Sequence, residues 1–146
     1  MEAFLQYLTF PFLLEGMWLT LRIFAASMVG GLALGLLIAL MRLSPYRLLS
    51  GLAWTYVWLI RGTPVLLQLV FLSAALPYNG IVMPPVTTAI IGFSLNEAAF
   101  AGEIIRGGIL SVSRNQTLAA ASLGMGSLLT LRRIVLPQAV RAHLAA

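Results

Sequence analysis

Residues 23–41 read IFAASMVGGLALGLLIALM and contain no charged side chain. This stretch decides the fold, because a helix of about 17–25 apolar residues crosses the hydrocarbon core of a bilayer. We therefore expect a first transmembrane helix over residues 17–41. Gly31 and Gly35 form a G-x-x-x-G pair within it, which either lets another helix approach closely or reflects only the glycine content of the span.

The composition of the whole chain indicates the same class of protein. Of its 146 residues, 60% are hydrophobic and 9% are charged, whereas soluble domains carry about a quarter charged residues. All nine cationic side chains are arginines and four carboxylates oppose them, which gives a net charge of +5. Because membrane proteins concentrate such an excess in cytoplasmic loops, the charge predicts topology and lipid contact rather than nucleic-acid binding.

Residue types that serve catalysis or metal binding are scarce. The sequence has no cysteine and a single histidine, His143, so it offers neither a thiolate site nor a histidine cluster. It also has no G-x-x-x-x-G-K-[ST] loop, the pattern that holds nucleotide phosphates. We expect no catalytic residue, no metal and no cofactor on this chain, and no enzymatic activity of its own.

Charged residues next to the apolar runs set the predicted topology. Arg42 and Arg47 flank the helix-stopping Pro45, and by the positive-inside rule this loop faces the cytoplasm, so the N-terminus lies outside. The next apolar run contains Arg61, which is costly at the centre of a span. We therefore expect a helix in the cytoplasmic interface over residues 48–60 instead of one straight span.

A break in the chain is expected at Arg61-Gly62-Thr63. Thr63 and Pro64 resemble a helix N-cap followed by proline at the first helical position, which is a start signal. The second span is then predicted over residues 64–78 and the third over residues 85–105, with an external turn rich in proline and glycine between them. The sequence thus predicts an all-α membrane protein with about three spans.

The segment over residues 113–136 is predicted to be cytoplasmic and helical. Ser113 and Gln116 fit a capping box, and the helix that follows should run to Leu123, with Gly124 in the left-handed conformation. A second helix is expected from residue 127 to just before Pro137. Residues 118–131 carry no charge yet are too few to span, so they pack under their own helices or dock into a partner's groove.

Polar side chains inside the predicted spans are candidates for a substrate pathway, because burying them is costly without a partner. Glu97 follows Pro85 by about 18 Å of helix, close to the middle of a bilayer core. We expect its carboxylate to contact a substrate ammonium or to pair with an arginine of a partner subunit. Asn96 and Gln68 either line the pathway or join helices, and Asn96 should not share a helix face with Glu97.

Glu103 and Arg106 lie three residues apart near the cytoplasmic end of the third span. This spacing predicts an i,i+3 ion pair. Arg61 is expected to anchor the break either to lipid headgroups or to a carboxylate such as Glu103.

Several motifs at matched spacing resemble a known family. LAAASLG at residues 118–124, nine further residues and IVLP at 134–137 are similar to the E-A-A-x-x-x-G-x(9)-I-x-L-P signature of membrane subunits of ATP-binding-cassette importers. RGTPVLLQ at 61–68, SLN at 94–96 and AGEIIRGGI at 101–109 resemble blocks of the polar amino-acid permeases within that group. The resemblance covers nearly the whole chain.

This resemblance implies a type I importer bundle in the bacterial inner membrane that moves polar amino acids. It implies a second permease subunit, a periplasmic amino-acid-binding protein and separate ATPase subunits that hold the ATP and grip the short helix after the third span. The residues that it assigns to ATPase coupling are Leu118, Ala119, Ala120, Leu123, Gly124 and Met125. Its structural motif residues are Arg61, Gly62, Thr63, Pro64, Glu103, Arg106, Ile134, Leu136 and Pro137.

The chain departs from the family pattern in two ways. Leu118 stands where the signature has glutamate, which predicts weaker coupling or reliance on a different paired subunit. The family continues for about two further spans, so we expect the 146 residues to be a fragment with three spans and the coupling helix. Three other classes stay open: an ion-driven transporter or channel, a membrane assembly or sensory subunit, and, least favoured, a membrane enzyme.

Overall fold

The computed structural model describes residues 11–139, and every regular element in that range is helical. His143 lies outside the described residues. The elements in chain order are α2 (Pro11–Leu43), α3 (Arg47–Arg61), α4 (Val65–Val70), the π-helix η1 (Phe71–Ala75), α5 (Leu76–Tyr78), α6 (Pro85–Ser111), α7 (Arg114–Ser122), α8 (Ser127–Thr130) and the π-helix η2 (Leu131–Val135). The predicted all-α class is confirmed.

Two of these helices, α2 and α6, are long and apolar enough to cross a membrane. Both exceed their predicted ranges, since α2 is already helical at Pro11 and α6 continues through Arg106 to Ser111. The adjacent Gly107 and Gly108 do not end α6, although glycine is a weak helix former. Gly108 lies against Ala139, whose Cβ would be 3.4 Å from an added Cβ, whereas Gly107 has open space around it.

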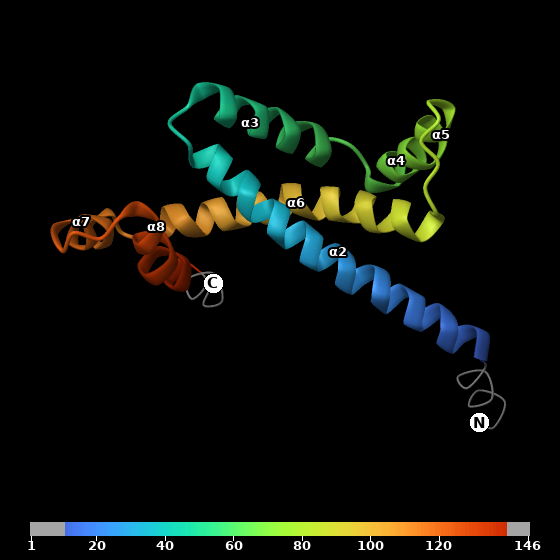
Figure 1. Cartoon of the computed structure of the whole chain (residues 1–146), viewed down its shortest axis with the longest axis horizontal. Coiled ribbons are helices and arrows are strands. Elements are labelled where there is room, and N and C mark those ends of the chain that lie inside the picture. The colour runs from blue at the N-terminus through green and yellow to red at the C-terminus, as the bar shows by residue number, and fades with distance from the viewer. Residues whose placement is uncertain (1–10, 140–146) are drawn as a thin grey trace.

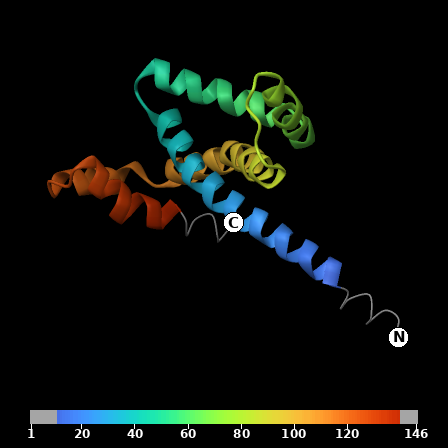
Figure 2. The same ribbon diagram turned by 45° about the vertical axis from the view of Figure 1, so that its right-hand side comes forward.

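The two long helices run in the same direction and cross near the middle of the molecule (Figures 1 and 2). They approach closely along a glycine seam. A Cβ added at Gly35 would lie 2.9 Å from the Cβ of Ala101 and 3.1 Å from the backbone nitrogen of Gly102. One added at Gly31 would lie 2.6 Å from the Cβ of Glu97. The G-x-x-x-G pair therefore has the helix-packing role, and its partner is α6 of the same chain.

Small residues and weak polar contacts complete the packing around the seam. Ala98 and Ala99 of α6 are fully buried. The Ser94 hydroxyl donates to the carbonyl of Ser27 at 3.4 Å, and the Ser27 hydroxyl donates to the carbonyl of Ile90 at the same distance. Where helices meet without a hydrophobic driving force, such close van der Waals packing and interhelical hydrogen bonds hold them together.

The stretch between α2 and α6 folds into two helical pieces at an angle of 102°: α3 and the run Val65–Tyr78. Val65–Tyr78 is at most about 21 Å long at 1.5 Å per residue, short of a roughly 30 Å bilayer core. Only together with α3 does it pass as a broken span or a re-entrant loop. α3 packs on both long helices, and the Tyr56 hydroxyl donates to the carbonyl of Leu95 in α6.

The break between α3 and α4 lies where the sequence predicts it, at Arg61-Gly62-Thr63. The start of α4 is shifted by one residue from the prediction. Pro64 is the extended N-cap residue of α4 and not its first helical residue. The side chain of Thr63 is directed back at α3 and not at α4. Its hydroxyl donates to the carbonyl of Leu59 at 3.0 Å, so it closes the end of α3 instead of capping α4.

Both π-helices end two residues before a proline, η1 before Pro77 and η2 before Pro137. A proline in a helix has no N–H to donate and its ring crowds the carbonyl four residues earlier, here those of Ser73 and Arg133. The wider π-turn leaves room for the ring and lets the helix continue. The expected helix end before Pro137 is therefore wrong, because residues 136–139 remain helical.

Candidate functional site

The short helix α7 extends from one end of α6, on the side of the molecule opposite α4 and α5 (Figure 1). Its first turn is capped as predicted: the Ser113 hydroxyl accepts a hydrogen bond from the backbone N–H of Asn115 at 3.3 Å. The N–H of Gln116 bonds to the Ser113 carbonyl at 3.0 Å. Among the described residues, no return bond from the Gln116 side chain completes the box.

A glycine joint ends α7. Gly124 has φ of +74°, the left-handed conformation that the sequence predicts. The N–H of Met125 bonds to the carbonyl of Ala120 at 3.0 Å, and the N–H of Gly124 bonds to that of Ala121 at 2.9 Å. This pair of bonds is the Schellman motif, which satisfies the last carbonyls of a helix. α8 then begins at Ser127, as predicted.

The coupling segment, residues 113–136, has an inner and an exposed side. Ala120 is buried, and α7 packs back on α8 and η2 around a cavity of about 340 Å³. Leu123 and Leu128 are 81% and 79% exposed, and Leu118 is 55% exposed. The segment thus covers part of its own surface and leaves leucines uncovered. Exposed apolar groups of this kind are typical of surfaces that bind a partner.

The family-signature residues after the joint lie on the helix that returns from α7. Ile134 and Leu136 are half-buried and Pro137 is exposed, while the most buried position is Val135 between them. The sequence pattern thus identified the correct helical turn but not its most buried side chain, Val135. Ala119, by contrast, is exposed on α7, whereas its neighbour Ala120 is 1% exposed.

Glu97 is half-buried on α6, against Gly31 of α2. It lines a cavity of about 430 Å³, and Asn96 lines the same cavity together with Ser27, Thr20 and apolar side chains. The two side chains still face different helices as expected, because Asn96 donates to Gln68 of α4 and Glu97 lies against Gly31 of α2. Neighbouring helical residues are about 100° apart, and a groove between two helices is wide enough to be reached from both positions.

Gln68 lies in α4 and its side-chain amide is directed back at the break. Its nitrogen lies 2.9 Å from the carbonyl of Ile60 and 2.8 Å from the hydroxyl of Thr63. Its oxygen accepts a bond of 3.4 Å from the amide of Asn96. The amide of Gln68 thus joins α3, α4 and α6, which is the helix-joining alternative of the two that the sequence left open.

An ion-pair cluster surrounds Glu103. Its Oε2 lies 2.9 Å from a guanidinium nitrogen of Arg106, which is the predicted i,i+3 pair. Its Oε1 lies 3.0 Å from Nε of Arg42, at the end of α2. In the sequence Arg42 was only a topology signal, and this second pair was not predicted. Arg42 and Glu103 are 61 residues apart, and only the register of α2 on α6 brings them together.

The guanidinium of Arg61 lies against an aromatic ring. Its guanidinium carbon lies 5.1 Å from the centre of the Phe100 ring, within reach of a cation–π interaction. In the described part of the chain, both ion pairs belong to Glu103 and neither involves Arg61. Among these described residues, the structure therefore does not contain the predicted contact of Arg61 with a carboxylate. Its contact with lipid headgroups stays a prediction.

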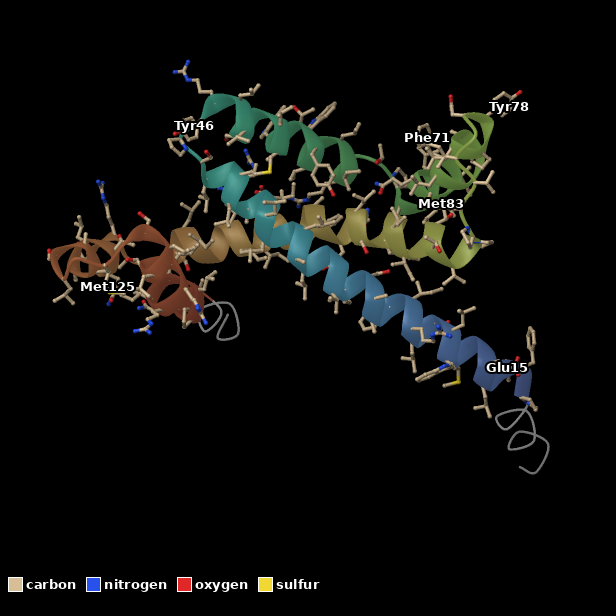
Figure 3. All side chains as sticks on the ribbon, in the orientation of Figure 1. Glu15, Tyr46, Phe71, Tyr78, Met83 and Met125 are labelled. Carbon is tan, nitrogen blue, oxygen red and sulfur yellow. The ribbon has the colours of Figure 1, made fainter. Side chains whose placement is uncertain are left out.

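The ends of the molecule differ in charge. Tyr46 and Met125 lie toward one end and Tyr78, Met83 and Glu15 toward the other in Figure 3. Arginines gather at the first end, in the loop after α2, at the end of α6 and in the coupling segment: Arg42, Arg47, Arg106, Arg114, Arg132 and Arg133.

Comparisons with known proteins agree on one group. Residues 31–146 match the family described as binding-protein-dependent transport system inner membrane component. The probable amino-acid ABC transporter permease protein YckA of Bacillus subtilis is 44% identical over 136 residues, which cover 93% of this chain and 60% of that protein. The L-cystine transport system permease protein TcyB of the same species is 40% identical over 92% of this chain and 57% of its own length.

Two further relatives extend the comparison. The arginine transport system permease protein ArgU of Corynebacterium glutamicum is 38% identical over 84% of this chain and 43% of its own length. A solved structure described as an amino acid ABC transporter with histidines superposes with a TM-score of 0.82 at 34% identity, over 97% of this chain and 65% of that one. The chain therefore spans less than two thirds of the length of these relatives.

Proposed function

The chain belongs to the family of binding-protein-dependent transport system inner membrane components, and we propose that it is permease machinery of an ATP-binding-cassette importer for polar amino acids. In this proposal the chain moves substrate across the inner membrane and performs no chemistry. ATP is bound and hydrolysed by separate ATPase subunits, a binding protein delivers the substrate, and a second permease subunit completes the pathway.

The observation that carries the proposal is the form of the coupling segment. α7 is short, capped at both ends and leaves Leu118 and Leu123 exposed beyond the end of a long membrane helix. A rigid element of this kind transmits a rigid-body movement, because its ends are fixed by hydrogen bonds and its exposed leucines fit a hydrophobic groove. The groove is assigned to the ATPase subunit.

The proposed orientation follows from the arginines. The end that holds the α2–α3 loop and the coupling segment is assigned to the cytoplasm by the positive-inside rule, and α2 then starts outside. The bent stretch from α3 to α5 returns the chain toward the outside before α6 crosses inward. The external turn around Asn79 and Gly80 carries no charge, in keeping with this orientation.

The cavity between α2 and α6 is the proposed substrate contact on this chain. Glu97 lines it, and no described residue forms an ion pair with that carboxylate. An unpaired carboxylate in a largely apolar cavity favours an ammonium group. Relatives are named for arginine, L-cystine, glutamate/aspartate and glutamine transport, which all carry an α-ammonium group.

The test is substrate-stimulated ATP hydrolysis. The full-length subunit is reconstituted in liposomes with its ATPase and binding protein, and hydrolysis is measured with each polar amino acid. The proposal predicts stimulation by at least one of them, with uptake of the same amino acid. An ion-driven transporter would instead take up substrate without ATP and respond to a proton or sodium gradient, and that outcome would refute the proposal.

A further inference from the structure

A cavity of about 450 Å³ lies between α3 and the crossing of α2 and α6, apart from the Glu97 cavity. The side chains that matter among its lining residues are Arg42, Trp54, Trp58, Arg61, Phe100 and Glu103. Its volume falls in the usual range for small-molecule sites. No step of the proposed transport function uses it.

Cations outnumber anions around this cavity. Both oxygens of Glu103 are already paired, one with Arg42 and the other with Arg106. Arg61 lies over Phe100, and in residues 11–139 neither recorded ion pair includes it. Two guanidinium groups, those of Arg42 and Arg61, and the single carboxylate of Glu103 line the cavity, which leaves it positive and leaves the planar donors of Arg61 available to an anion.

The other wall of the cavity is aromatic. The indole rings of Trp54 and Trp58 stack with their centres 6.3 Å apart and an angle of 11° between their planes. Both side chains are more than half exposed. Tryptophan prefers the headgroup level of a bilayer, where its apolar ring and its N–H both find suitable surroundings. The stacked pair thus suits a cavity whose mouth opens at the headgroup level.

We propose that this cavity binds the phosphate of an anionic phospholipid from the cytoplasmic leaflet, with Arg61 as its main donor and the Trp54–Trp58 pair against the glycerol region. An arginine fork matches two phosphate oxygens, and basic pockets between helices on the cytoplasmic side bind anionic headgroups. The bound lipid holds the Arg61-Gly62-Thr63 break at the interface. The proposal depends on the proposed orientation and not on the transported substrate.

Tryptophan fluorescence tests the proposal, because two of the three tryptophans lie at the cavity. The full-length protein with Trp18→Phe is placed in bilayers with brominated phosphatidylglycerol or brominated phosphatidylcholine, and quenching gives the relative affinity. We expect phosphatidylglycerol to be favoured about fivefold, the contribution of one guanidinium at an anionic surface. Arg61→Gln removes the preference and Arg61→Lys keeps part of it.

The control is Arg47→Gln, which removes a neighbouring cytoplasmic arginine that does not line the cavity. The preference must survive this change. Equal quenching by both lipids, or equal loss of preference in Arg47→Gln and Arg61→Gln, overturns the proposal. Competition by millimolar inorganic phosphate would assign the site to a soluble phosphate and overturn the lipid assignment. ATPase stimulation by substrate, measured in parallel, separates this result from failure of the transport function.

Discussion

Two regions of the molecule differ in how they pack: the glycine seam between α2 and α6, and the coupling segment. At the seam, Gly31 and Gly35 bring two backbones so close that an added Cβ would collide with its neighbours. In the coupling segment, α7 buries Ala120 while Leu118 and Leu123 remain exposed. The seam finds its partner inside the chain, whereas the exposed leucines have none among the described residues. A tightly packed helix pair thus carries a short helix with exposed leucines, which is the proposed docking element, and the following variants test the two regions separately.

The largest effect is expected from Gly35→Leu in the seam. The new side chain meets Ala101 and the backbone of Gly102, which cannot move aside. Overpacking of this kind costs typically about 1–3 kcal/mol, and a leucine at this contact belongs at the upper end. Thermal unfolding in detergent should show a large loss of stability. Gly107→Leu is the control, since nothing lies within 4 Å of a Cβ there. Equal losses of stability in both variants would show that the close contact at Gly35 does not stabilise the helix pair.

The second effect is expected from Glu103→Gln, which leaves Arg42 and Arg106 without their shared carboxylate. Removing one partner of a fully buried pair costs about 3–5 kcal/mol. The side chains here are 17–29% exposed, so we expect about 2 kcal/mol. Glu15→Gln, on the exposed part of α2, should leave the unfolding temperature unchanged. If both variants unfold at the same temperature, the cluster does not join α2 to α6.

A smaller effect is expected at the joint of the coupling segment. Gly124→Ala forces a Cβ into the left-handed conformation, which costs about 1–2 kcal/mol for residues other than glycine. The matched change Gly126→Ala acts at a residue with φ of −66° and open space around its Cβ. We expect Gly124→Ala to reduce substrate-stimulated ATP hydrolysis and to lower stability by no more than this local cost. Equal hydrolysis in the two variants would mean that the Schellman turn is not needed for coupling.

The smallest effect is expected from Leu118→Glu, which restores the carboxylate of the family signature. An exposed charge pair contributes about 0.2–1 kcal/mol, so ATPase association should strengthen by at most about fivefold. The glutamine of Leu118→Gln has nearly the same shape as glutamate but no charge, so this variant should not strengthen ATPase association. Affinity measured with the solubilised complex decides the point. Unchanged or weaker binding of Leu118→Glu would show that this chain's α7 docks without a carboxylate contact.

The sequence predicted features that depend on a few neighbouring residues. The break at Arg61-Gly62-Thr63 and the left-handed Gly124 both follow from local backbone chemistry. The G-x-x-x-G pair was left with two interpretations, and the position of α6 against Gly35 decides for helix packing.

Features that depend on register were missed. The pairing of Arg42 with Glu103 requires knowing how far α2 slides along α6. The three bonds from the Gln68 amide nitrogen to the end of α3 require the direction in which the chain turns after Gly62. The helix that runs through Pro137 was missed because the proline rule assumes α-helical turns, and the π-turn of η2 relaxes it.

Docking of α7 on the ATPase is tested by the accessibility of position 123 with and without the ATPase. The chain has no cysteine, so Leu123→Cys supplies a single thiol on the coupling segment, and Tyr78→Cys supplies one at the opposite end. The rate of maleimide labelling is measured for each in the reconstituted complex. If α7 docks as proposed, the ATPase slows labelling at position 123 at least tenfold and leaves position 78 unchanged. Equal labelling of Leu123→Cys in both states would contradict docking at this segment.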